Sequence, residues 1–243
     1  MIINSLENKD VKKYYKLKQK KYRDKYKMFL VEGYHLVEEA YNANLLEKVI
    51  LLDDEILDFD TCYMCVTKEV MKKLSTLETP PNIIGVCKIP NHKAGNIGNK
   101  ILLLDNVQDP GNLGTIIRSA KAFDVDSIVV SNDTVDLYNP KVVRATQGII
   151  FHTNIFKTDL IEFVKELKSK DYKIYSTNVE NGVELKEIIT PNKYAIVMGN
   201  EGNGVRGEIS SLADTNIYIK MNKKVESLNV AIATSIILYE LEK

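Results

Sequence analysis

The stretch ILLLDNVQDPGNLGTIIRSAKAFDVDSIVVS, residues 101–131, decides the fold that this sequence predicts. Its two ends, ILLLD and DSIVVS, are short runs rich in branched apolar residues, and a helix is predicted between them near residues 113–123. Strands rich in Ile, Leu and Val that alternate with helices are typical of βαβ units and of a parallel sheet buried on both faces. The stretch therefore predicts an α/β domain.

The same alternation continues from this stretch toward residue 243. The sequence predicts further strands at HTNIFK, YKIYSTN, YAIVMGN and NIYIKM, and helices near residues 139–148, 158–170 and 227–242. In an open α/β sheet, ligands bind in crevices at the carboxyl ends of the strands. We therefore look for a site in the loops that follow the predicted strands.

The first 90 residues predict a smaller, mixed α/β unit. We expect helices within residues 5–45, with Ser5 as the N-cap of the first. The segment MFLVEGYHLVEEAYNA, residues 28–43, has apolar positions at helical spacing and is predicted as another helix. Strands are predicted at LEKVILL, CYMCV and IIGVCKI.

A polar segment separates the two units. Residues 90–100 contain Pro, Gly and Asn, a composition typical of a linker or an exposed connection. We therefore expect a first domain at residues 1–92, a linker at 93–100 and a second domain at 101–243.

The composition is that of an ordinary globular protein. Of the 243 residues, 44% are hydrophobic and 27% are charged, which excludes a disordered chain. No apolar run approaches the roughly 20 residues that a membrane span needs. The beginning, MIINSLENKD, lacks the basic and then apolar layout of a secretory signal. We expect a cytoplasmic protein without a membrane partner.

The cysteines and histidines do not form a metal-binding pattern. Cys62 and Cys65 make a C-x-x-C whose second half, needed for a four-thiolate zinc site, is missing. We interpret the two as buried, small apolar side chains. The histidines, His35, His92 and His152, have no second ligand at helical or strand spacing. We therefore predict no metal site.

Positive charge is concentrated near the N-terminus, although the formal net charge of the chain is zero. Residues 1–30 hold ten Lys or Arg against three acidic residues. Such an asymmetry is typical of a surface that contacts a polyanion, and it is equally typical of a solvated helix face. Four interleaved tyrosines could stack on bases, which makes nucleic acid a reasonable partner: Tyr14, Tyr15, Tyr22 and Tyr26.

The loop after ILLLD is the first candidate for chemistry. Its glycines permit tight backbone geometry, and Asn112 and Arg118 lie six positions apart, where they could face one pocket. A guanidinium presents a planar fork of donors that suits phosphate oxygens. The alternative is an ordinary helix arginine paired with Asp105 or Asp109.

Two later segments are the other candidates. GNEGNG, residues 199–204, follows a buried strand, but its spacing is neither the dinucleotide fingerprint nor a P-loop. It would place the carboxylate of Glu201 at the mouth of the sheet. MNKKVESLNV, residues 221–230, runs into the last helix, where Ser227 is the expected N-cap and Asn229 lies near the first turn.

Together the three segments resemble the signature motifs of a known family. DNVQDPGNLGTIIRSA, IVMGNEGNGV and IYIKMNKKVESLNVAIATSIILYE closely resemble those of the SpoU/TrmH branch of the SPOUT RNA methyltransferases, as does the intervening YNPKVVRATQGIIFH. KKYRDKYKMFLVEG and TPPNIIGV resemble, less specifically, the small ribosomal-protein-like RNA-binding domain that is often attached to these enzymes.

This resemblance implies a parallel-sheet α/β domain tied in a trefoil knot, and a homodimer with its site near the subunit interface. It implies methyl transfer from S-adenosyl-L-methionine to a ribose 2'-hydroxyl of RNA. The family's catalytic positions fall on Asn112, Arg118, Glu201, Ser227 and Asn229. Its cofactor-binding positions fall on Gly199, Asn200, Gly202, Ile219, Met221 and Leu228. For contacts to RNA we expect Lys20, Lys21, Arg23 and Arg144.

This chain departs from the family's pattern at a few positions. Lys220 stands where a proline is usual and Lys223 where a glycine is usual, and Asn82 replaces a usual glutamine in the first domain. Ribosomal RNA is the preferred substrate because the N-terminal domain resembles that of ribosomal RNA enzymes. Transfer RNA and a catalytically silent RNA-binding protein remain the alternatives, whereas a nucleotide-binding enzyme is disfavoured because a phosphate loop is missing.

Overall fold

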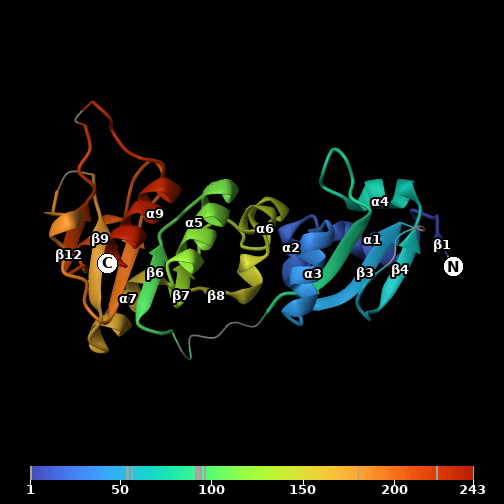
Figure 1. The fold of residues 1–243 in the computed structure, drawn as a ribbon, viewed down its shortest axis with the longest axis horizontal. Helices are drawn as coiled ribbons and strands as arrows, with labels where there is room; N and C mark the ends of the chain where they lie inside the picture. Colours follow the sequence, from blue (N-terminus) through green and yellow to red (C-terminus); the bar gives the residue numbers. More distant parts are fainter. Residues whose placement is uncertain are drawn as a thin grey trace. The chain divides into compact units, whose positions relative to one another are not determined.

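The computed structural model describes residues 2–52, 55, 57–90, 95, 97–179, 181–222 and 224–242. Its contacts divide the chain into two compact units, and each is built on a sheet of its own (Figure 1). The first unit comprises Met1–Asn91 and Asp136–His152, and the second comprises His92–Val135 and Thr153–Lys243. Of the expected linker, residues 93, 94 and 96 lie outside the described residues, as does His92.

The second unit contains a wholly parallel sheet. Within the described residues its strand order is β10-β12-β9-β11-β6-β7-β8, and every neighbouring pair is parallel. The strands are β6 (Lys100–Leu104), β7 (Ser127–Val130), β8 (Asn154–Lys157), β9 (Lys173–Thr177), β10 (Val183–Glu184), β11 (Tyr194–Met198) and β12 (Thr215–Tyr218). The predicted α/β architecture with a parallel sheet is confirmed.

Helices bury this sheet. They are α5 (Pro110–Ala122), α7 (Leu160–Ser169), α8 (Gly207–Ser210) and α9 (Val230–Leu241), with a short 3-10 helix, η2, at Leu185–Glu187. Residues of α7 such as Phe163 and Leu167 share a core with Ile101 and Leu103 of β6. The alternate β6 residue Leu102 points to the opposite face and is also fully buried, so the sheet is covered on both sides.

The first unit contains a mixed sheet of order β1-β4-β3-β5-β2. Its strands are β1 (Ile2–Ile3), β2 (Met28–Glu32), β3 (Leu46–Leu52), β4 (Tyr63–Val66) and β5 (Ile83–Lys88). Its helices are α1 (Lys9–Lys16), α2 (Lys20–Tyr26), α3 (Tyr34–Asn42), α4 (Lys68–Leu74) and α6 (Pro140–Thr146), followed by the 3-10 helix η1 (Ile149–His152). Helices α1 and α4 pack on β3, β4 and β5 to form its core. No described helix of either unit is long and apolar enough to cross a membrane.

The predicted helix over residues 28–43 is wrong in its first half. Met28–Glu32 forms β2, which pairs antiparallel with β5, and α3 begins only at Tyr34. Gly33 separates the two with a φ of 96°, a left-handed conformation that favours glycine. Tertiary pairing therefore overrides the helical spacing of the apolar residues.

Two smaller expectations also fail. Asn8, and not Ser5, caps α1, because its side chain accepts hydrogen bonds from the main-chain nitrogens of Asp10 (2.9 Å) and Val11 (3.4 Å). Cys62 is exposed and Cys65 is half-buried, so the interpretation of both as buried side chains is wrong.

The segment of residues 136–152 belongs to the first unit, although it joins β7 to β8 of the second along the chain. Its Tyr138 and Phe151 rings pack on Phe29 of β2, with ring centroids 4.7 and 6.0 Å apart. His152 Nε2 lies 2.9 Å from the carboxylate of Glu39 on α3. The first unit is therefore completed by chain from the middle of the sequence.

Arg23 holds this segment in place and does not reach the surface. Its side chain is 5% exposed, its Nε donates to Asp136 Oδ2 at 3.0 Å, and its NH2 donates to the same oxygen. Its NH1 donates to the main-chain oxygens of Leu17 (2.7 Å) and Lys18 (2.9 Å), at the end of α1. The expectation that Arg23 contacts RNA is therefore corrected: its guanidinium is buried and bonded within the protein.

Replacing Asp136 with Ala tests this ion pair. The change leaves the Arg23 guanidinium buried without its carboxylate, and removing one partner of a buried pair costs about 3–5 kcal/mol. We expect Asp136→Ala to lower the free energy of unfolding, measured with urea, by about 3 kcal/mol. The control Asp24→Ala breaks the exposed Lys20–Asp24 pair and should cost less than about 0.5 kcal/mol. Equal losses in the two variants would contradict this role of Arg23.

Candidate active site

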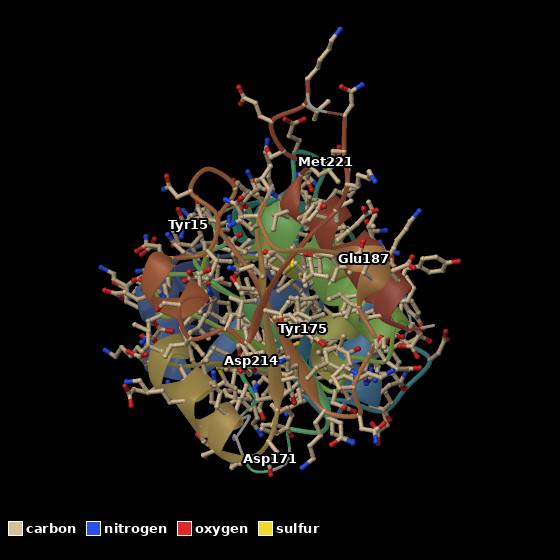
Figure 2. The ribbon with its side chains drawn as sticks, turned by 90° about the vertical axis from the view of Figure 1, so that its left-hand side faces the viewer. Tyr15, Asp171, Tyr175, Glu187, Asp214 and Met221 are labelled. Atoms are coloured by element: carbon tan, nitrogen blue, oxygen red, sulfur yellow. The ribbon has the colours of Figure 1, made fainter. Side chains whose placement is uncertain are left out.

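Three loops meet at one edge of the parallel sheet. They follow β6, β11 and β12, and because all these strands run parallel, their carboxyl ends lie at the same edge. Met221, just after β12, and Asp171, just before β9, lie at opposite ends of the unit in Figure 2. The three sequence motifs are thus brought to the carboxyl edge.

A chain of side-chain hydrogen bonds joins one residue from each motif. Asn229 Nδ2 donates to Asn112 Oδ1 at 2.9 Å, and Asn112 Nδ2 donates to Glu201 Oε1 at 3.1 Å. The Glu201 carboxylate also accepts from the main-chain nitrogens of Asp109 (3.3 Å) and Gln108 (3.4 Å). Three of the five predicted catalytic residues therefore form one network.

Asn229 is also the N-cap of α9, a place predicted for Ser227. Its Oδ1 accepts from the main-chain nitrogens of Ala231 (2.9 Å) and Ile232 (3.3 Å), and the helix begins at Val230. The prediction that Ser227 caps this helix is wrong, because asparagine caps as well as serine and stands directly before the first apolar residue. Ser227 is exposed and lines the cavity described below.

Asn200 shapes the glycine loop from inside. Its Oδ1 accepts from the main-chain nitrogens of Gly202 (2.9 Å) and Asn203 (3.2 Å), and its Nδ2 donates to the main-chain oxygen of Asn106 at 2.8 Å. The main chains of Asn200 and Gly204 exchange two hydrogen bonds of 3.0 Å. A Cβ on Gly199 would lie 2.0 Å from the carbonyl carbon of Gly204, so only glycine allows this closure.

An ion pair between the buried Asp105 and the exposed Arg206 anchors the same loop to the end of β6. Asp105 is completely buried, and it accepts hydrogen bonds from the main-chain nitrogen of Arg206 (2.9 Å) and from its Nε (2.8 Å). The hydrogen bond to Asp105 raises the pKa of Arg206. Sequence reasoning missed Arg206, although an Asp after one strand and an Arg after the neighbouring glycine loop were a usable signal.

Arg118 is separate from this network. It lies on the exposed side of α5, and it makes no hydrogen bond or ion pair with any described residue. The alternative of an ordinary pair with Asp105 or Asp109 is wrong, because Asp105 binds Arg206 and Asp109 caps α5 by accepting from Asn112 N at 2.8 Å. Its guanidinium is therefore available to a ligand.

A cavity of about 400 Å³ lies beside the network. It is lined by all six residues predicted to bind a cofactor, together with Glu201 and Ser227: Gly199, Asn200, Gly202, Ile219, Met221 and Leu228. Apolar side chains such as Met198, Ile217 and Ile237 form part of its wall. Sequence reasoning missed Asn178 and Glu226, which also line it, although Asn178 directly follows β9 at the same carboxyl edge.

Two departures from the family's pattern, Lys220 and Lys223, fall in the loop beyond β12, and the structure describes the first of them. Lys220 is 74% exposed and pairs with Glu184 of β10, with Nζ 3.2 Å from Oε2. The hydrogen bond to Glu184 raises the pKa of Lys220. Lys223, the second departure, lies outside the described residues.

The residues predicted to contact RNA lie in the first unit. Lys20 pairs with Asp24, and Lys21 Nζ lies 4.8 Å from the centroid of the Tyr22 ring; both lysines are exposed. Arg144 is half-buried and donates to Thr76 Oγ1 at 2.8 Å. Of these four residues only Lys20 and Lys21 are exposed, and Lys21 makes no ion pair with any described residue. No group of three or more His, Cys, Asp or Glu among the residues described is arranged to hold a metal ion.

Comparison with protein families finds two matches. The model of the SpoU rRNA Methylase family matches residues 99–239, and the model of the MRM3-like substrate binding domain matches residues 8–85. The first match covers more than half of the chain and includes all three motifs of the site.

Individual relatives extend over the whole chain. The Bacillus subtilis 23S rRNA (guanosine(2553)-2'-O)-methyltransferase RlmP is 40% identical over 245 residues, which cover 98% of each chain. The crystal structure of an AdoMet-bound rRNA methyltransferase from Sinorhizobium meliloti superposes with a TM-score of 0.89 at 28% identity, covering 99% of this chain and 97% of that one. A Synechocystis uncharacterized tRNA/rRNA methyltransferase is 29% identical over 99% of this chain and 93% of its own.

Two substitutions at Asn229 separate its two hydrogen-bonding roles. Asn229→Ala removes the cap of α9 and the bond to Asn112, whereas Asn229→Asp keeps an acceptor for the cap and loses the donor. We expect Asn229→Ala to lower the free energy of unfolding by about 1 kcal/mol and Asn229→Asp to lower it by less. Urea unfolding and amide exchange of the first turn of α9 measure this difference. Equal loss of protection in both variants would show that Asn229 does not cap the helix.

Proposed function

Because this chain belongs to the SpoU rRNA methylase family, we propose that it transfers a methyl group from S-adenosylmethionine to a ribose 2'-hydroxyl of ribosomal RNA. The observation that carries this proposal is the hydrogen-bonded chain of Asn112, Glu201 and Asn229 beside the cavity. It joins the three motifs of the family into one site. The protein is thus an RNA 2'-O-methyltransferase.

The cavity fits the cofactor of this family. A volume of about 400 Å³ lies in the range of small-ligand sites, and the glycine edge leaves the main chain open to close approach. The carboxylates of Glu201 and Glu226 are acceptors for hydroxyl or ammonium groups, and the apolar wall suits an aromatic base. When bound, S-adenosylmethionine supplies a methyl group carried on a positively charged sulfur. Main-chain contacts would come from Gly199, Ile219 and Leu228.

Arg118 is the proposed catalytic group for the RNA. Arginine remains protonated in proteins, so it does not act as a base. Its free guanidinium instead orients an RNA phosphate and stabilises negative charge that develops on the 2'-oxygen. The phosphate or a water molecule then accepts the hydroxyl proton. Ser227, exposed at the cavity beside Asn229, is a further donor and acceptor at this place.

The first unit is proposed to bind the RNA. Residues 8–85 match a substrate-binding domain, and the exposed Lys20 and Lys21 lie on α2 of that unit. We assign residues 1–92 to substrate binding and 101–243 to methyl transfer, with 93–100 as the connection. Ribosomal RNA is favoured over transfer RNA because the relative named for 23S rRNA matches the chain over its whole length. With this substrate the enzyme acts in the cytoplasm.

We also propose the homodimer and the trefoil knot that the family resemblance implies. Helix α9 is apolar on all sides, and its outward stripe is far from covered: Ile232 is 54% exposed, Ile236 38% and Tyr239 58%. These residues lie at i, i+4 and i+7, on one face of the helix. A second copy of the chain would bury this stripe next to the site.

Mapping ribose 2'-O-methylation across total RNA tests the proposed activity. Deleting the gene should remove one methyl from ribosomal RNA, and the wild-type protein should restore it. Arg118→Lys keeps the charge and loses the fork, so purified Arg118→Lys should turn over about 100-fold more slowly with unchanged cofactor binding. Lys165→Ala, on the surface of α7, is the matched control and should leave turnover unchanged. If the deletion strain keeps every ribose methyl of its ribosomal RNA, the proposed activity is refuted.

Sedimentation velocity tests the homodimer. Ile232→Glu places a charge in the proposed interface, so the variant should sediment as a 27.6 kDa monomer where the wild type sediments at twice that mass. Ile189→Glu introduces the same charge at a residue that is 91% exposed and lies outside α9, and it should leave the dimer intact. A monomeric wild-type protein would overturn the assembly.

A further inference from the structure

A groove in the first unit presents an aromatic ring to solvent. The groove has a volume of about 250 Å³ and lies along α1, with its wall completed by α4. It is lined by Leu6, Glu7, Lys12, Tyr15, Lys16 and Lys73. Tyr15 is 40% exposed, whereas its neighbour Tyr14 is 5% exposed and belongs to the core. Of these two adjacent tyrosines, only Tyr15 is available to a ligand.

Positive charge around this ring is only partly neutralised within the protein. Glu7 is the one acidic side chain among the described lining residues, and it pairs with Lys12, which lowers the pKa of Glu7. Lys16 and Lys73 make no ion pair with any described residue. A cluster in which lysines outnumber the acidic side chains destabilises the free protein slightly and attracts a polyanion. The charge therefore favours a nucleic-acid strand over a neutral or cationic ligand.

The two cations nearest the ring behave differently. Lys18 Nζ lies 5.0 Å from the Tyr15 centroid and is held there, because it donates to the main-chain oxygens of Lys73 and Ser75, both at 2.7 Å. Lys73 Nζ lies 4.6 Å from the same centroid, but its side chain is exposed. Lys73 is therefore free to leave the ring for a phosphate and uncover an aromatic face.

We propose that this groove holds one unpaired nucleotide of the RNA substrate, with its base stacked on Tyr15 and its flanking phosphates bound by Lys16 and Lys73. The inference rests on the proposed function for the identity of the RNA. The occupant is single-stranded because bases within a helix are stacked on one another and are not available to a protein ring. Stacking on an aromatic side chain tolerates any base, so the groove holds the strand and does not read its sequence.

Binding to labelled oligonucleotides tests the groove with the full chain. The probes are a fluorescein-labelled single-stranded decauridine and an RNA duplex of the same length, followed by anisotropy at fixed salt. Tyr15→Leu keeps apolar bulk without an aromatic face and should weaken single-strand binding about tenfold, whereas Tyr15→Phe should bind like the wild type. Lys73→Ala should lower the slope of log affinity against log salt by about 0.7, the value for one lost phosphate contact on a single strand.

Tyr63→Ala is the matched control. Tyr63 is 60% exposed in the same unit, and no described lysine or arginine lies over its ring, so its loss should leave binding unchanged. The inference is overturned if Tyr15→Leu binds the single strand like the wild type, if Tyr63→Ala weakens binding as much, or if duplex binding falls equally.

Enzyme kinetics separate this inference from the proposed function. Tyr15→Leu should raise KM for ribosomal RNA about tenfold with kcat and cofactor affinity unchanged, since no residue of the groove lines the cofactor cavity. If the deletion strain keeps every ribose methyl, the proposed function is refuted, and the oligonucleotide result is unaffected. If the deletion strain loses a ribose methyl but Tyr15→Leu binds the single strand like the wild type, the role of the groove is refuted and the proposed function stands.

Discussion

The pairing of β11 with β6 is the constraint on which the site depends. The two strands run parallel from Tyr194 opposite Lys100 to Met198 opposite Leu104, and Asp105 N donates to Met198 O at 2.8 Å just beyond the last pair. This register sets the loop after β6 beside the glycine loop. It also puts Asp105 where its buried carboxylate can bind both the main chain and the guanidinium of Arg206.

Side-chain amides build the rest of the site on that frame. Asn200 closes the glycine loop and ties it to Asn106, while Asn229 caps α9 and reaches Asn112. A side-chain amide both donates and accepts hydrogen bonds, so each of these residues can accept from one segment and donate to another. A carboxylate could only accept, and an ammonium could only donate. The Glu201 carboxylate completes the network because only acceptors are needed where main-chain nitrogens converge.

The sequence predicted the second unit better than the first. Ile-, Leu- and Val-rich strands that alternate regularly with helices have few competing interpretations, and all the predicted strands of that unit are present. In the first unit, Met28–Glu32 has the apolar spacing of a helix and still forms a strand, because pairing with β5 satisfies its backbone and buries its side chains. In a short apolar run the spacing of residues does not distinguish a helix from a strand, and the segment that packs or pairs with the run decides.

The sequence by itself determined the parallel α/β architecture, the three motifs and the glycines and amides at their centres, because these follow from local periodicity and residue type. Only the tertiary structure decided which partner each polar group has. It buried Arg23 against Asp136, assigned Asp105 to Arg206 and left Arg118 free, and it gave the cap of α9 to Asn229. Hydrogen bonds and ion pairs form between groups far apart in the sequence, 113 residues for Arg23 and Asp136 and 117 for Asn112 and Asn229, and their choice depends on which segments the fold brings together.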